Sequence, residues 1–290
     1  MKKHACHIII LFLLLFSAGS SAAQAPLLNS YAPANATVYL DFNGCTVEGT
    51  LWNENGKIIA ESPGFSPPTI TWIYKKIAAH FKLFNLNVTT DPAMYERAPV
   101  HQRIHIIFTP EGNWWGPAPG VSAIGSFSWG DDTPAWVFTN NLLNNPSYIA
   151  EAATHQIGHT LGLQHQSIYD SYGIMISELS GGESNTLSNQ APLMGIPFYK
   201  TADWSAGTPS TGASRFQNDT ALIAGAPNDI GYRKNTGPYN DPSKAAVRIE
   251  KQQPDAIELS SSGDYAYRLF DIGGRLLTQG NLRKGWNQIR

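Results

Sequence analysis

Three histidines with metal-ligand spacing form the most chemically informative part of the chain. They are His155, His159 and His165, and Gly162 lies between the last two. On a helix, residues four apart differ by about 40° around the axis, so His155 and His159 can direct imidazole nitrogens to one ion. Gly162 can adopt the left-handed backbone that ends a helix, and the chain can then return with His165 as a third ligand. Three neutral imidazoles and an open position are typical of a Zn²⁺ site.

Gln156 gives this segment its second unusual feature. Residues 151–166, EAATHQIGHTLGLQHQ, resemble the metzincin signature H-E-x-x-H-x-x-G-x-x-H of zinc metallopeptidases, with Gln156 in place of the glutamate. In that family the glutamate takes a proton from the attacking water and delivers it to the leaving amine. An amide does neither, although it can still hydrogen-bond water. A positioned general base contributes roughly 10²- to 10⁴-fold to the rate, so the resemblance implies strongly reduced or absent peptidase activity.

Two hypotheses from different classes follow from this substitution. The chain is either a secreted zinc metalloendopeptidase, in which Gln156 or another acid assists catalysis, or a non-catalytic zinc protein that binds peptide in the same cleft. Glu151 is the nearest acid, one helical turn before His155. In both cases the cofactor is one Zn²⁺ ion and the partner is a peptide or protein. Calcium binding stays open.

Hydrophobic patterning predicts the elements that must position this segment. Residues 38–42 alternate as a strand, and Ile70, Ile73 and Ile77 recur at helical spacing after a proline pair. Asn145 and Pro146 are favourable as the N-cap and first residue of a helix that carries His155 and His159. Further strands are predicted at residues 87–90, 103–109, 121–127 and 135–139, and a further helix at residues 217–224. Together these elements predict an α+β fold.

The metzincin resemblance implies a twisted, mostly parallel sheet with one antiparallel edge strand beside the active-site helix, followed by a C-terminal subdomain. Residues 121–127 would be that edge strand, and Ile124, Gly125 and Ser126 would line the substrate cleft. Free backbone groups on such a strand can pair with an extended peptide, but the strand could equally be an ordinary sheet edge. Trp114, Trp115 and Trp129, given their place in the sequence, either grip a ligand at the rim or anchor their own loop.

A methionine turn is the next feature that the resemblance implies, because metzincins carry a methionine beneath the zinc as an apolar floor. Met194, between Pro192 and Gly195, is the match, and Met175 is the competing candidate. Some members of the family add a tyrosine ligand two residues later. That position is Ile196 here, so no fourth protein ligand is expected.

The N-terminus has the features of a secretory signal peptide over residues 1–23. Lys2 and Lys3 precede a short apolar run, and small residues follow it. We therefore expect a secreted or cell-surface protein, without a transmembrane helix and monomeric. Cys45 is then the only cysteine left, which makes it either a small packed residue or a weak candidate for reactivity or metal binding. The formal net charge is −2, so nucleic acid is not an expected partner.

The end of the sequence predicts a separate unit. The metallopeptidase-like domain is expected over residues 24–233, a turn-rich linker over 234–246, and a β-rich tail over 247–290. Residues 267–271 and 275–279 surround a glycine pair and predict a β-hairpin. The tail resembles the front of a type IX secretion sorting domain without its usual last strands, which would imply contact with secretion machinery; a plain β-appendage is the alternative.

Overall fold

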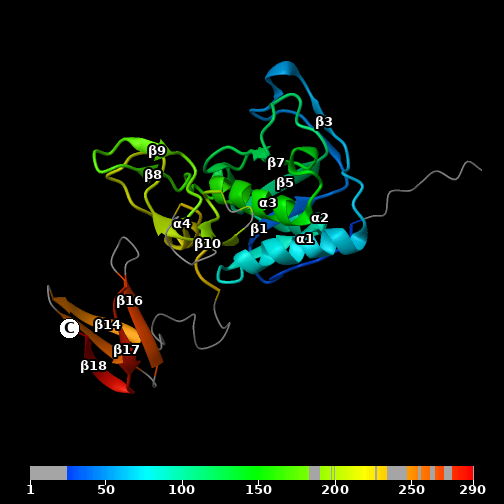
Figure 1. Cartoon of the computed structure of the whole chain (residues 1–290). Helices are drawn as coiled ribbons and strands as arrows, with labels where there is room; N and C mark the ends of the chain where they lie inside the picture. The colour runs from blue at the N-terminus through cyan, green and yellow to red at the C-terminus, as the bar shows by residue number, and fades with distance from the viewer. Residues whose placement is uncertain are drawn as a thin grey trace, which may run out of the picture.

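The structure, a computed structural model, describes residues 25–182, 190–196, 198, 200–225, 227–233, 247–253, 256–261, 265–270 and 276–289. The fold is α+β, as the sequence predicts, with helices packed on a mixed sheet and smaller sheets after it (Figure 1). The predicted signal peptide and the predicted linker lie outside the described residues.

A five-stranded sheet forms the centre of the main domain. Its order is β4 (Leu86–Thr89), β1 (Ala36–Asp41), β5 (Arg103–Thr109), β7 (Ala135–Phe138) and β6 (Gly120–Val121). The first four strands are parallel, and β6 runs antiparallel to β7 at the edge. A mostly parallel sheet with one antiparallel edge is therefore present.

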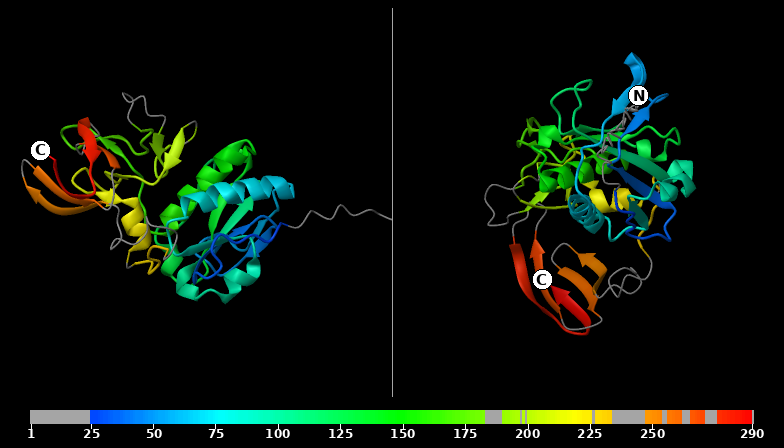
Figure 2. Two further views of the ribbon diagram at one scale, coloured as in Figure 1. Left: turned by 90° about the horizontal axis from the view of Figure 1, so that it is seen from below. Right: turned by 90° about the vertical axis from the view of Figure 1, so that its right-hand side faces the viewer.

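Two helices, α1 (Pro67–His80) and α3 (Pro146–Thr160), pack against each other and cover one face of this sheet (Figures 1 and 2). Helix α3 begins as the sequence predicts, with Asn145 as its N-cap and Pro146 as its first residue, and α1 begins in the same way at Pro67 after Ser66, an N-cap that was not predicted. Alternate strand residues such as Val38, Leu40 and Ile106 meet the apolar faces of the helices and form the main core. Helix α3 is thus held rigidly in the centre of the domain.

The other face of the sheet carries elements that were not predicted. A hairpin of β2 (Cys45–Val47) and β3 (Ile58–Ala60) packs there, and the Trp52 indole donates a hydrogen bond to the Pro134 carbonyl oxygen at 2.8 Å. Helix α2 (Pro92–Arg97) brings Tyr95 against the rings of Tyr39 and His105.

Short 3-10 helices occur in the connections of the main domain. They are η1 (Asn53–Asn55), η2 (Val100–Gln102), η3 (Ser126–Ser128) and η4 (Asn140–Leu142).

The predicted strand at residues 121–127 is wrong beyond its first residue. After β6 the chain leaves the sheet, and Gly125 adopts a left-handed backbone with φ 82° before η3 begins. The Gly125 N–H donates to the carbonyl oxygen of His159 at 2.9 Å. The segment therefore closes on the end of α3 through a tertiary hydrogen bond, which the local β-rich pattern does not reveal.

A C-terminal subdomain follows α3 and consists mainly of short strands and turns. Helix α4 (Asp219–Ala224) ends it, with Asn218 as the N-cap, in agreement with the helix predicted from the sequence. The strands are β8 (Ile168–Tyr169), β9 (Met175–Ser177), β10 (Gln190–Pro192), β11 (Thr201–Asp203), β12 (Ala206–Gly207) and β13 (Gln217–Asn218).

The described residues of the tail lie mainly in β-strands. The predicted hairpin strands correspond to β16 (Tyr265–Phe270) and β17 (Leu276–Leu282), which pair antiparallel. A second sheet is formed by β14 (Val247–Gln253), β15 (Ala256–Ser261) and β18 (Gly285–Ile289), and these strands were not predicted individually. Among the described residues, no helix has the length and apolar character needed to span a bilayer.

Candidate metal centre

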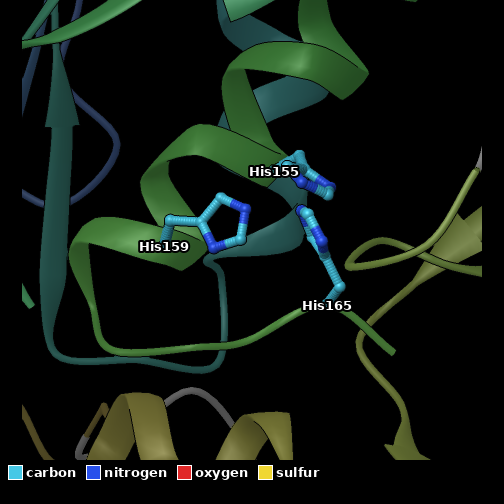
Figure 3. A group of neighbouring side chains, drawn as sticks. All are labelled: His155, His159 and His165. Atoms are coloured by element: carbon cyan, nitrogen blue, oxygen red, sulfur yellow. The ribbon is translucent and has the colours of Figure 1, made fainter. Parts of the chain in front are cut away.

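The three predicted ligands converge on one point. His155 and His159 project from α3 and His165 from the loop after it, and Figure 3 shows their rings turned toward one another. The ring centroids are 4.6, 4.8 and 5.2 Å apart, and one nitrogen from each ring lies within 4.8 Å of the other two. The spacing in the sequence therefore becomes a compact set of three nitrogen donors.

Each imidazole is oriented by a hydrogen bond from its other nitrogen. The Nδ1 atoms of His155 and His159 lie 2.8 Å from the carbonyl oxygens of Leu193 and Leu163, and Nδ1 of His165 lies 2.8 Å from Glu178 Oε1. Carbonyl and carboxylate oxygens only accept, so each Nδ1 must donate. This fixes the tautomer in which every Nε2 lone pair is free for a metal ion.

Burial keeps the two helical histidines neutral. The pKa of His155 is lowered to about 3 and that of His159 to about 4, mainly by desolvation and to a smaller extent by the neighbouring histidines, His165 in both cases. Only a neutral imidazole can bind a metal. The donor set, three imidazole nitrogens on oriented rings with two of the imidazoles held neutral by burial, therefore fits Zn²⁺.

Gly162 turns the chain toward His165, as predicted. Its φ is 92°, its N–H donates to the His159 carbonyl oxygen, and the N–H of Leu163 donates to the Gly158 carbonyl oxygen. These two bonds form a Schellman motif, which ends α3 and reverses the chain direction. The helix terminus and the third ligand are thus consequences of one glycine.

A buried network holds the loop that carries His165. Asp219 is fully buried and accepts hydrogen bonds from the side-chain amides of Gln166 and Gln217, each at 2.9 Å. Gln217 also pairs with the backbone N–H and carbonyl of Gln164. Sequence reasoning missed Asp219 and Glu178, because neither is close in sequence to the histidines and no local pattern marks them.

Gln156 is buried beside the candidate metal ligands His155 and His159. The hydroxyl of Ser122 donates to Gln156 Oε1 at 2.7 Å, which ties the side chain to the segment after β6. The close approach of Gly120 to the Gln156 side chain leaves little room between the sheet edge and the helix. The amide is therefore held in place by neighbouring groups, and it brings no titratable group to the site.

A cavity of about 240 Å³ adjoins His155 and His165. Its walls include Gly120 from the sheet edge, Glu151, His155 and Gln156 from α3, and Ile196 from the turn after Met194. The predicted cleft residues Ile124, Gly125 and Ser126 do not line it; Ala118, Pro119 and Gly120 form that wall. The assignment of Ile124, Gly125 and Ser126 to a substrate cleft therefore stays a prediction, and the residues before them line this cavity.

Glu151 is the acid nearest this cavity on α3. Only 9% of its surface is exposed, and its Oε2 atom is buried without a hydrogen-bond partner. Burial raises the pKa of Glu151 to about 7, and the more distant charge of Lys76 opposes this shift. A carboxyl group that titrates near neutral pH therefore faces the same space as the candidate metal ligands.

Met194 lies in a tight turn packed against the helix that carries His155 and His159, as expected for the methionine beneath the metal site. It is fully buried in a tight turn closed by the Gly195 N–H and the Pro192 carbonyl oxygen. Its sulfur lies so close to Gly158 that a β-carbon there would collide with it.

Met175 lies in β9 and is 39% exposed, so the competing candidate is wrong. Of the tryptophans, Trp114 packs on Trp115 and Trp136, as a loop anchor does.

Comparison with known proteins adds no relative. No protein-family model matches the chain, and no curated protein is similar to it. The function of this chain must therefore be inferred from its own residues and their geometry.

Proposed function

We propose that this chain is a secreted zinc protein of the metallopeptidase type, which binds an extended peptide beside the metal and hydrolyses it poorly or not at all. The observation that carries the proposal is the convergence of three free imidazole nitrogens next to a cavity. Each ring is oriented by its own hydrogen bond, which is the arrangement of a built metal site and not of scattered surface histidines.

His155, His159 and His165 would hold the ion. Zn²⁺ in such a site polarises a carbonyl group and activates water for hydrolysis. The residues of this chain support binding better than turnover. The Gln156 amide can neither take up nor release a proton as a general acid or base does. The Ser122 hydroxyl already donates a hydrogen bond to its oxygen. The apolar walls of the cavity favour a peptide side chain, and the edge position of β6 favours an extended peptide backbone.

A second candidate function is an active endopeptidase that uses Glu151 as its base. The observation that favours it is the unpartnered, buried carboxyl oxygen of Glu151 on the cavity wall. A pKa of about 7 is suited to general-base catalysis at neutral pH. The two candidates differ in which residue must be changed to alter activity.

A comparison of Gln156→Glu with the natural chain tests the proposal. Both proteins are brought to equal zinc content and assayed on a quenched peptide library, with Gln190→Glu as a matched control at an exposed position. We expect a gain of about 10²-fold or more in cleavage for Gln156→Glu alone. Chelator should abolish the gain.

Two results would contradict the proposal. If the natural chain cleaves peptides as fast as Gln156→Glu and loses activity in Glu151→Gln, the second candidate is correct. If neither protein binds zinc or peptide, the metallopeptidase assignment itself is wrong.

A further inference from the structure

A second cluster of metal-binding side chains lies away from the three histidines. Asp41 ends β1, Cys45 begins β2, and His105 lies within β5. A carboxylate oxygen, the thiol sulfur and a ring nitrogen from these residues all lie within 4.8 Å of one another. Oxygen, nitrogen and sulfur donors thus meet at one place, which sheet packing alone does not require.

This cluster lies on the opposite face of the sheet from α3. Ile104 and Ile106 point into the core beneath α1 and α3, so His105, between them, points to the other side. There its ring packs against Tyr39 and Tyr95, with centroids 5.1 and 5.7 Å away. The cluster is therefore separate from the candidate metal centre, and a ligand in one does not depend on the other.

The backbone between Asp41 and Cys45 is shaped to bring them together. The N–H of Asn43 donates to Asp41 Oδ1 at 2.8 Å, and Gly44 adopts a left-handed backbone with φ 84°. A β-carbon on Gly44 would lie only 2.8 Å from the Ala60 carbonyl oxygen and from the Ser62 nitrogen. This turn therefore needs glycine, and it fixes the thiol near the carboxylate.

Among the described residues, Asp41 forms no ion pair with a lysine or an arginine. The Asp41 side chain is 7% exposed, and Oδ2 lies 3.0 Å from His105 Nε2. Arg103 instead forms a two-pronged ion pair with Asp132. Besides the Asn43 N–H on Oδ1, this buried carboxylate has an imidazole and a thiol beside it, and these three donor groups together are suited to a divalent ion.

We propose that Asp41, Cys45 and His105 form a second Zn²⁺ site, in which three side chains hold the ion and one position stays open. Mixed nitrogen, oxygen and sulfur donors suit zinc better than the oxygen-seeking ions Ca²⁺ and Mg²⁺. On binding, the Cys45 thiol gives its proton to solvent and its sulfur binds the ion, while His105 binds as a neutral imidazole. The ion would join β1, β2 and β5 at the base of the β2–β3 hairpin.

Cobalt substitution tests this site directly. The full chain is freed of metal, reloaded with Co²⁺ alone, and its absorption spectrum and metal content are measured. A thiolate ligand gives Co²⁺ a charge-transfer band in the near-ultraviolet, which a site of three histidines lacks. We expect this band in the natural chain, and we expect Cys45→Ser to lose it together with one metal ion per chain.

Three control variants assign the band. Cys6→Ser removes the only other cysteine of the sequence and should leave the band unchanged. His159→Ala should keep the band and lose one metal ion, so failure of the three-histidine site is distinguishable from failure of this one. His105→Ala should weaken or abolish the band without removing the thiol. Absence of the band from the loaded natural chain, or its persistence in Cys45→Ser, would overturn the proposal.

Discussion

At the scale of single residues, the three histidines differ in how they are held. Two donate to backbone carbonyl oxygens, whereas His165 donates to the carboxylate of Glu178, whose side chain is 63% exposed. A backbone acceptor is fixed by the fold, but an exposed side chain must be ordered on binding. His165 is therefore the ligand whose orientation depends most on one replaceable residue.

Substitution of Glu178 should weaken metal binding. We expect Glu178→Ala to lower zinc affinity about tenfold, at the lower end of the effect of such partners because the carboxylate is partly solvated. Competition with a chromophoric chelator measures the change. Glu54→Ala, at an exposed position in η1, is the control. Equal affinities in both variants would show that Glu178 does not orient His165.

Glu151 should make stability depend on pH. Its carboxyl has a pKa raised from 4.5 to about 7 by burial, so the folded chain keeps a proton that the unfolded chain releases. Stability contributed by the protonated form is present below pH 4.5 and is lost as the pH rises to about 7. Glutamine cannot lose a proton, so Glu151→Gln avoids this loss at high pH. We expect the free energy of unfolding of Glu151→Gln, relative to that of the natural chain, to be about 2 kcal/mol higher at pH 8 than at pH 4.5.

Denaturant unfolding at the two pH values measures this effect. The control Glu54→Gln changes an exposed carboxyl. Its free energy of unfolding should differ from that of the natural chain by the same amount at pH 4.5 and at pH 8. If Glu151→Gln also shows no pH-dependent difference, the carboxyl of Glu151 is not desolvated as described.

At the scale of elements, the end of α3 places the third ligand. The Schellman motif at Gly162 depends on a backbone with φ 92°, and a β-carbon there would lie 3.2 Å from Leu222. The helix, the turn and the position of His165 are therefore coupled. A strained turn would move the ligand even if the helix stayed intact.

Gly162→Ala should reduce both stability and zinc affinity. We expect a loss of about 1 to 2 kcal/mol in unfolding free energy from the left-handed backbone, and a clear drop in zinc affinity because His165 shifts. Gly56→Ala is a matched control, since Gly56 also has a positive φ but nothing within 4 Å. It should cost similar stability and leave zinc affinity unchanged. Unchanged zinc affinity in Gly162→Ala would contradict the coupling.

Local sequence patterns predicted the elements that depend on local causes. The N-cap and proline of α3, the apolar spacing of α1 and the alternation in β1 and β5 are each sufficient to specify the element. The strand expected at residues 121–127 failed because its outcome depends on the Gly125 hydrogen bond to His159, a contact between distant segments. The β2–β3 hairpin was missed for a related reason, since it is stabilised by packing on the far face of the sheet.

In the candidate site, the residues that could be predicted are mainly those that lie close together in the sequence. His155, His159, His165 and Gly162 lie within eleven consecutive positions and share one helix end, so their spacing fixes their geometry. Met194 was identified by its turn residues. Glu178 and Asp219 act through tertiary contacts, and the partnerless state of Glu151 depends on what surrounds it in space. None of these is encoded in a short motif.

At the scale of the whole molecule, the metal should contribute to folding. The three rings come from α3 and from the following loop, which Asp219 ties to the C-terminal subdomain. An ion bound only by the folded chain stabilises it by about 2.7 kcal/mol when free metal is one hundred times Kd. We expect chelation to lower Tm, and re-addition of Zn²⁺ to restore it.

His159→Ala is the control for that measurement. It should start with a lower Tm and respond less to chelator than the natural chain, because it keeps only the proposed site at Cys45. An equal response in both proteins would mean that the histidines do not bind the stabilising ion.

Zinc analysis of the purified full chain, beside His159→Ala, tests the central claim most directly. Both proteins are prepared without chelator and shown to be folded before zinc is measured per chain. The geometry of His155, His159 and His165 predicts that the natural chain holds one zinc ion more than the variant. Equal zinc content in the two folded proteins, or a natural chain without zinc, would contradict it.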